Sequence, residues 1–197
     1  MDSAIVSPPE GISFNTLRVV VASNISGTVL TDYPLKDWTF NIEEKSTLAR
    51  LFQTLVSIPK EFPNETLQQV SFKVDEKSSA RRGSNVESTP NLNLAIFMKR
   101  DVIIGIFYDV AEENEIPKLY DYFQSLAKRI YKEFKIDHME YYESPKIKHE
   151  LEKAFQESKD LSVESNTRFQ GFAEKIKQIL NCWIGFGTIY CIYVFSK

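Results

Sequence analysis

The pattern of apolar and polar positions is clearest over residues 94–134. Two nearly continuous apolar runs, 94–98 and 102–108, are separated by a polar turn at 99–101, and this arrangement predicts a β-hairpin. Because neither run alternates with polar residues, we expect both strands to be covered on both faces. Gly105, inside the second run, indicates either a β-bulge or a close contact with a helix.

An amphipathic helix is predicted directly after this hairpin. Apolar residues recur there at steps of three, four and seven, which places them along one helical face. Asn114 is expected to cap the helix, and Pro117 is tolerated because it falls in the first turn. The expected buried stripe consists of Ile116, Leu119, Tyr120, Phe123, Leu126, Ala127, Ile130, Tyr131 and Phe134.

Three further elements are predicted before the hairpin. Residues 17–30 indicate two strands joined by a turn, in which Gly27 can adopt a positive φ. Residues 43–58 carry apolar side chains at helical spacing, and Pro59 is expected to end that helix. Residues 66–74 alternate between polar and apolar side chains, which is typical of a half-buried strand.

The segments after the amphipathic helix are predicted to add shorter helices. Residues 145–158 form the next helix, with Ser144 as N-cap and Phe155 on its apolar face. His138 is expected in the loop before this helix. Another short helical pattern lies within residues 161–180.

Residues 75–91 are polar, rich in serine and without periodicity, which indicates a mobile loop between two neighbouring strands. Within this loop Arg81 and Arg82 precede Ser84, a spacing that resembles the target of a basophilic protein kinase. Phosphorylation of Ser84 would add about −1.5 to −2 charges beside the two arginines. The alternative is a solvated loop in which the arginines occur by chance.

Length and composition indicate either one ordinary globular domain with an extension or one large domain. The chain has 197 residues, of which 43% are hydrophobic and 26% charged. We divide it into a flexible tail at 1–13, a domain at 14–160, and a helical segment with an apolar tail at 161–197. A net charge of −3 without a basic stripe argues against nucleic acid as a partner. Two cysteines and the lack of a signal-peptide pattern favour a cytoplasmic setting.

The apolar tail has two interpretations. Residues 179–195 contain no charge and follow Lys175 and Lys177, which is typical of a tail anchor. The run is near the lower limit of the roughly 17 to 25 residues that a spanning helix needs. The alternative is a helix end, a turn and a buried strand, because β-branched and aromatic residues dominate 188–195. In the anchor interpretation Cys182 is a candidate for palmitoylation. The candidate membrane-segment residues are Ile179, Trp183, Ile184, Phe186, Ile189, Ile192, Val194 and Phe195.

Residues that could carry chemistry are sparse. His138 and His149 are the two histidines; neither has Cys or His at metal-ligand spacing, and we expect both at the surface. The seven glycines are scattered, so no phosphate-binding or dinucleotide-binding loop is recognisable. No local motif pairs a nucleophile with a base. We therefore expect a non-enzymatic protein that uses no cofactor and no metal ion.

The order of predicted elements is strand, strand, helix, three strands, helix, helix, and it resembles that of longin domains. The resemblance rests on the hairpin LAIFMKRDVIIGIFYDV with the helix PKLYDYFQSLAKRIYKEF, and on the opening LRVVVASNISGTVLTDYPLKDW. It covers roughly residues 14–160. It implies a profilin-like α+β fold in which a five-stranded antiparallel sheet is flanked by helices.

The resemblance also implies a non-enzymatic interaction module in vesicle and membrane traffic, as a subunit or adaptor of a tethering, SNARE-like or small-GTPase-regulating complex. No sustained heptads follow residue 160, so a fusion-driving SNARE is not expected. The alternative is a PAS-like or GAF-like ligand-binding module, which a roomy pocket would favour. The expected location is cytoplasmic, on the cytosolic face of an endomembrane if the tail is an anchor. The expected partner surface is the polar side of the amphipathic helix, formed by Lys118, Asp121, Lys128 and Lys132.

Overall fold

An antiparallel sheet of five strands organises the fold. The computed structural model describes residues 8–35, 45–61, 69–72, 91–157 and 160–192. The strand order across the sheet is β2-β1-β5-β4-β3. The strands are β1 (Phe14–Ser23), β2 (Val29–Pro34), β3 (Gln69–Phe72), β4 (Asn91–Lys99) and β5 (Val102–Val110).

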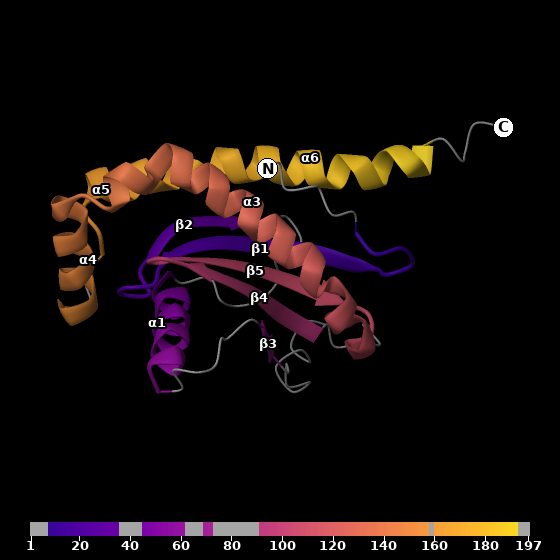
Figure 1. Cartoon of the computed structure of the whole chain (residues 1–197), viewed down its shortest axis with the longest axis horizontal. Coiled ribbons are helices and arrows are strands. Elements are labelled where there is room, and N and C mark those ends of the chain that lie inside the picture. Colours follow the sequence, from indigo (N-terminus) through magenta and orange to yellow (C-terminus); the bar gives the residue numbers. More distant parts are fainter. Residues whose placement is uncertain (1–7, 36–44, 62–68, 73–90, 158–159, 193–197) are drawn as a thin grey trace, which may run out of the picture.

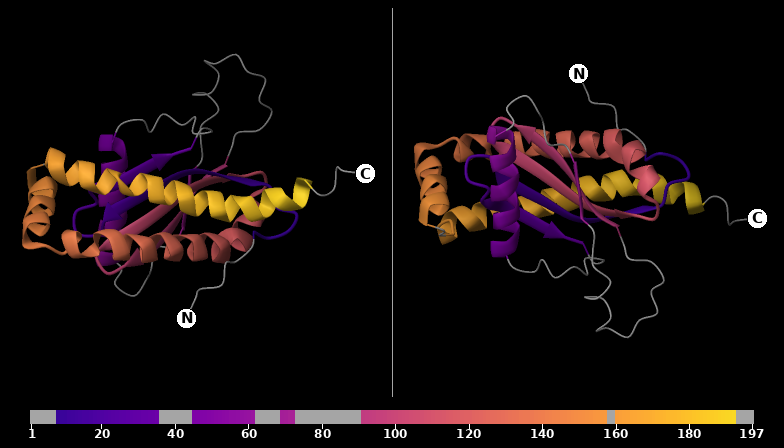
Figure 2. Two further views of the ribbon diagram at one scale, coloured as in Figure 1. Left: turned by 90° about the horizontal axis from the view of Figure 1, so that it is seen from above. Right: turned by 90° about the horizontal axis from the view of Figure 1, so that it is seen from below.

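Helices cover both faces of this sheet. The α1 helix crosses one face, whereas α3 and α6 lie side by side on the other, with α4 and α5 connecting them at one end (Figures 1 and 2). The helical elements are α1 (Lys45–Glu61), the 3-10 turn η1 (Glu113–Glu115), α3 (Ile116–Tyr142), α4 (Pro145–Glu157), α5 (Val163–Gln170) and α6 (Phe172–Ile192). The predicted α+β class, a five-stranded antiparallel sheet flanked by helices, is therefore confirmed.

The first predicted hairpin, β1–β2, is confirmed. Gly27 allows the turn of this hairpin to lie close to the backbone of α1. Gly27 has a φ of 71°, and its N–H donates to the carbonyl of Ser23 at 2.8 Å. A Cβ atom at this position would lie 2.4 Å from the backbone nitrogen of Gln53. The turn therefore requires glycine both for its conformation and for its distance from the helix.

The second predicted hairpin, β4–β5, is also confirmed. Lys99 pairs with Val102, so the turn consists of residues 100–101. Along β5, Gly105 passes directly under α1, where a Cβ atom would lie 2.7 Å from Cζ of Phe52. The register is regular at this glycine on both sides. Gly105 thus marks a close helix contact and not a bulge.

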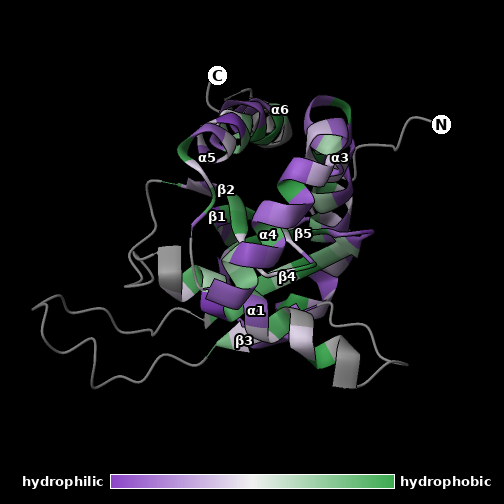
Figure 3. Ribbon diagram, turned by 90° about the vertical axis from the view of Figure 1, so that its left-hand side faces the viewer, coloured by the Kyte–Doolittle hydropathy of each residue, from purple (hydrophilic) through white to green (hydrophobic). Residues whose placement is uncertain are grey.

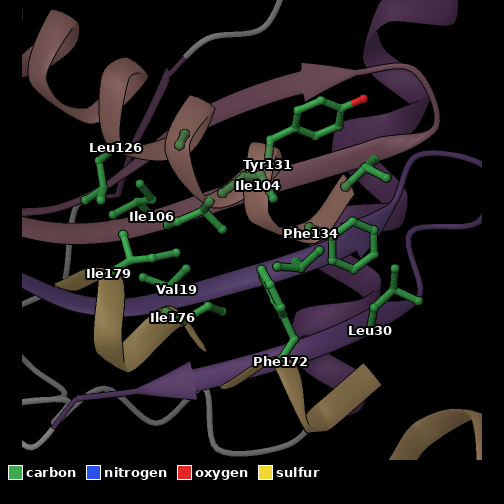
Figure 4. Close-up of a cluster of buried hydrophobic side chains, with 14 of the residues drawn as sticks. Val19, Leu30, Ile104, Ile106, Leu126, Tyr131, Phe134, Phe172, Ile176 and Ile179 are labelled. Atoms are coloured by element: carbon green, nitrogen blue, oxygen red, sulfur yellow. The ribbon is translucent and has the colours of Figure 1, made fainter. Parts of the chain in front are cut away.

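The sheet separates two apolar cores. The larger core lies under α3 and α6, where Phe134 and Phe172 pack against side chains such as Val19 and Leu30 (Figure 4). The smaller core lies under α1 and is centred on Phe52. Because β5 is covered on both faces, all but one of its residues are buried, which explains its unbroken apolar run.

The α3 helix differs from its prediction at both ends. It continues to Tyr142, so His138 is helical and half-buried and does not lie in a surface loop. The additional turns are stabilised because Met139 and Tyr142 are buried in the larger core. At the start, Asn114 lies within η1 and the N-cap position is occupied by Glu115, so the predicted cap is wrong.

Two further helix predictions need correction. The α1 helix continues through Pro59 to Glu61; the fixed φ of proline is compatible with a helix, and the cost near its end is one missing hydrogen bond. On α4, Phe155 is 51% exposed and not part of the buried face. The buried face of α4 consists of Ile147, Leu151 and Ala154. Ser144 does cap α4, because its Oγ accepts from the N–H of Ile147 at 3.5 Å.

The hydrophobic core continues past residue 160. The α5–α6 segment buries five apolar side chains under the helical layer, namely Phe169, Phe172, Ile176, Ile179 and Leu180. The α6 helix continues from these residues to Ile192, so the buried-strand interpretation is wrong as far as residue 192. Val194 and Phe195 lie outside the described residues.

Within the part of the chain that the structure describes, no helix combines the length and the apolar character needed to span a bilayer.

Candidate interaction surface

The α3 helix is fixed to the sheet through a buried hydrogen bond in its middle and a hydroxyl at its end. In the middle, the Gln124 side-chain amide donates to the carbonyl of Ile96 in β4 at 2.9 Å. At the end, the Tyr142 hydroxyl donates to the Asp101 carbonyl at 2.5 Å. Since its proton is used there, the same hydroxyl must accept from Ser23 Oγ at 3.0 Å. Burial raises the pKa of Tyr142, which keeps this donor protonated.

The predicted partner surface lies on the opposite side of α3 and is exposed. Lys118, Asp121, Lys128 and Lys132 are all exposed, and a step of about 100° per residue places them within an arc of about 80°. The outer turns of α3 are correspondingly hydrophilic, whereas the strands beneath are hydrophobic (Figure 3). Because the buried face is anchored, these four side chains project from a rigid element. We call them the α3 stripe.

The α3 stripe ends beside an exposed apolar side chain. Ile136 is 67% exposed, and Lys135 next to it is exposed as well. The sequence pattern predicts that the outer face of α3 is fully polar, and this exposed isoleucine departs from that prediction. The sequence pattern does not indicate it, because the apolar periodicity of this helix ends at Phe134.

An ion-pair cluster between α3 and α6 was not predicted from the sequence. Glu133 accepts from Arg129 at 3.0 Å along α3 and from Lys175 of α6 at 3.4 Å. The Glu133 side chain is only 11% exposed, which reduces the solvent screening of both pairs. The cluster joins the two helices of the outer layer along their shared side.

The outer edge of β2 is covered by α5 and the start of α6. Thr31 Oγ1 donates to the carbonyl of Phe169 at 2.7 Å, and the Gln170 amide donates to the carbonyl of Leu30 at 3.2 Å. The second bond satisfies a main-chain carbonyl of the edge strand, a group that would otherwise be open to strand pairing. The described α3 stripe is therefore a more accessible contact surface than this edge of the sheet.

A buried ion pair lies on the α1 side of the sheet. The guanidinium of Arg18 in β1 contacts both carboxylate oxygens of Asp32 in β2 at 2.7 and 2.6 Å. Their side chains are 4% and 12% exposed. Arginine within a Val-rich strand was the available sequence signal, since a buried cation needs a carboxylate nearby. Each of these two buried charges is neutralised by the other, so we assign this ion pair a structural role.

The remaining predicted sites have mixed outcomes. Ser84 lies outside the described residues. Cys182 is exposed on α6, as acylation would require. Of the predicted membrane-segment residues, Ile179 is buried in the core, and Trp183, Ile184, Phe186, Ile189 and Ile192 belong to the helical backbone of α6.

The histidines also differ from one another. His149 is exposed on α4, as predicted, whereas His138 is half-buried on α3. Among the described residues, no group of three or more histidine, cysteine or acidic side chains is arranged to hold a metal ion.

Comparison of the chain with models of protein families, with curated proteins and with solved structures gave no match.

Proposed function

We propose that this protein is a longin-like, non-enzymatic interaction module of intracellular membrane traffic, a subunit or adaptor of a tethering, SNARE-like or small-GTPase-regulating complex. The observation that carries the proposal is the connectivity of the fold. Two strands, α1, three strands and α3 follow one another along the chain, and the helices lie on opposite faces of the sheet. This is the order of elements on which the resemblance to longin domains rests.

The α3 stripe is the proposed contact surface for a protein partner. Three of its four residues, Lys118, Lys128 and Lys132, are cationic, so an acidic surface on the partner would complement it. The stripe lies on a helix that is anchored by its buried face, which limits the entropy lost on binding. The exposed Ile136 beside it adds an apolar contact that a partner can bury.

The partner assay is a pull-down with purified small GTPases, in both nucleotide states, and with trafficking-complex subunits. The test variant is Lys128→Glu/Lys132→Glu, and the control is Lys148→Glu/Lys153→Glu, which makes the same charge change at exposed positions on α4. We expect a retained partner that the α3 variant loses and the α4 variant keeps. Retention of no protein, or equal loss with both variants, would contradict the proposal.

We further propose that the chain acts in the cytoplasm and contacts an endomembrane through its apolar C-terminal tail. The support is the uncharged run at 179–195, of which Ile179 and Leu180 are used by the core. A truncation must therefore be placed after Leu180, because an earlier one would remove buried side chains. In carbonate extraction, the full chain should remain with membranes and the truncated chain should be released; release of both forms would refute the membrane contact.

A further inference from the structure

His138 lies inside a group of aromatic rings where α3, α5 and α6 meet. Its ring centroid is 5.5 Å from that of Phe134 on α3, 6.0 Å from Phe169 on α5 and 5.3 Å from Phe172 on α6. The three phenylalanines are at most 1% exposed. The imidazole is thus the ionisable member of an otherwise apolar contact between three helices.

The environment of His138 suits a neutral imidazole. Its Nδ1 atom is buried, and no hydrogen-bond partner for it exists among the described residues. Adding a proton there would place a donor and a positive charge in a site with no acceptor, which is costly. Burial, as the largest cause, lowers the pKa of His138 from its ordinary value.

Charged groups on the surrounding elements do not remove this cost. Asp137, beside His138 on α3, favours the charged imidazole, whereas Arg168 on α5 opposes it. Arg168 itself lies over the ring of Tyr141 at 3.9 Å. The charged residues near the start of α6 are engaged in other ion pairs. These pairs are Glu174 with Lys177 at 3.7 Å and Lys175 with Glu133 at 3.4 Å.

The aromatic contact holds the segment that covers the β2 side of the sheet. Phe169 and Phe172 lie on either side of the α5–α6 junction, and the Phe169 carbonyl accepts from Thr31 of β2. Phe172 lies beside Val19 and Leu30, which are both fully buried (Figure 4), and Phe169 belongs to the same apolar core. Separation of α5 and α6 from α3 would therefore expose apolar residues of the sheet.

We propose that His138 is a proton-operated latch, whose protonation weakens the docking of α5 and the first half of α6 onto α3 and uncovers the apolar surface of β1 and β2. The direction follows from proton linkage. The docked state binds the proton more weakly than the undocked state, in which the imidazole has its ordinary pKa of about 6.5. Docking is thus fully favoured above that pH and weakens as the pH falls below it. This latch does not depend on the proposed function.

Hydrogen–deuterium exchange of the full chain tests the latch. Protection of the amides at 169–180, corrected for the intrinsic effect of pH on exchange, is compared at about pH 8 and about pH 5, the range in which histidine changes charge. Protection should fall on acidification by up to tenfold for every pH unit between the pKa values of His138 in the two states. Amides of the central strand β5 should keep their protection.

Two variants at His138 and one control isolate the proton. His138→Phe keeps an aromatic ring without a titrating group, and His138→Gln provides a second non-titrating variant if the phenyl ring disturbs folding. Both should abolish the effect of pH, whereas His149→Gln, at the exposed histidine of α4, should behave as wild type. Unchanged protection in the wild type, a loss that persists without the imidazole, or an equal loss in β5 would each overturn the latch.

Discussion

Gly105→Ala adds one methyl group at the point where β5 passes closest to α1. The new Cβ would lie 2.7 Å from Cζ of Phe52 and 3.2 Å from Cδ1 of Leu94, which is closer than van der Waals contact allows. Both neighbours are fully buried, so neither side chain can turn into solvent. Overpacking of this kind costs about 1–3 kcal/mol. At about 2–4 °C per kcal/mol for a chain of this size, the melting temperature should fall by roughly 2–12 °C.

Thermal and urea unfolding, followed by circular dichroism, measure this loss. Phe52→Leu removes the ring atoms that meet the methyl group, so the double variant should be more stable than the sum of the two single effects predicts, by roughly 0.5–3 kcal/mol. Gly171→Ala is the control, because Gly171 has a φ of −55° and the nearest atom to its Cβ is the Arg168 carbonyl oxygen at 3.3 Å. It should change stability by less than about 1 kcal/mol in either direction, because its φ suits alanine and its contact is less severe. Wild-type stability of Gly105→Ala, or strict additivity in the double variant, would refute the packing argument.

Three other substitutions probe contacts that hold α3, α5 and α6 in place. Tyr142→Phe leaves the Asp101 carbonyl without this donor, so the free energy of unfolding should fall by about 1–3 kcal/mol in urea denaturation. Tyr120→Phe, on the same helix, is the control and should have little effect. Thr31→Val removes the bond to the Phe169 carbonyl and should selectively increase hydrogen exchange in α5; an unchanged rate would count against the covered edge. Glu133→Gln breaks the pairs to α3 and α6 and should cost about 1 kcal/mol at low salt, with a smaller cost at high salt.

The elements of the sheet could be predicted from the sequence because their signals are local. The apolar runs of β4 and β5 reflect burial on both faces, and Gly105 in the second run reflects the helix that crosses it. The stripe at 116–134 places one face of α3 on the sheet. From the same periodicity, the exposed positions of the α3 stripe could be assigned before the structure was known.

The parts that could not be predicted depend on contacts between distant segments. The last turns of α3 are stabilised by the burial of Tyr142, whose partners are Ser23 at the end of β1 and Asp101 in the β4–β5 turn. The burial of His138 likewise requires Phe169 and Phe172 from the C-terminal helices. Glu115 in place of Asn114 at the N-cap depends on the preceding 3-10 turn, for which the sequence gives no clear signal. Tertiary contacts override local preference at each of these places.

We propose that the α3 stripe is the surface through which this protein binds a partner in membrane traffic. It is tested most directly by placing a photoreactive amino acid at position 128 or 132 of α3, and at positions 148 and 153 of α4 as controls. After irradiation in cells, we expect the two α3 positions to form cross-links to a trafficking-complex subunit or a small GTPase, and the two α4 positions to form none. Cross-links of equal yield at all four positions, or none at positions 128 and 132, would contradict it.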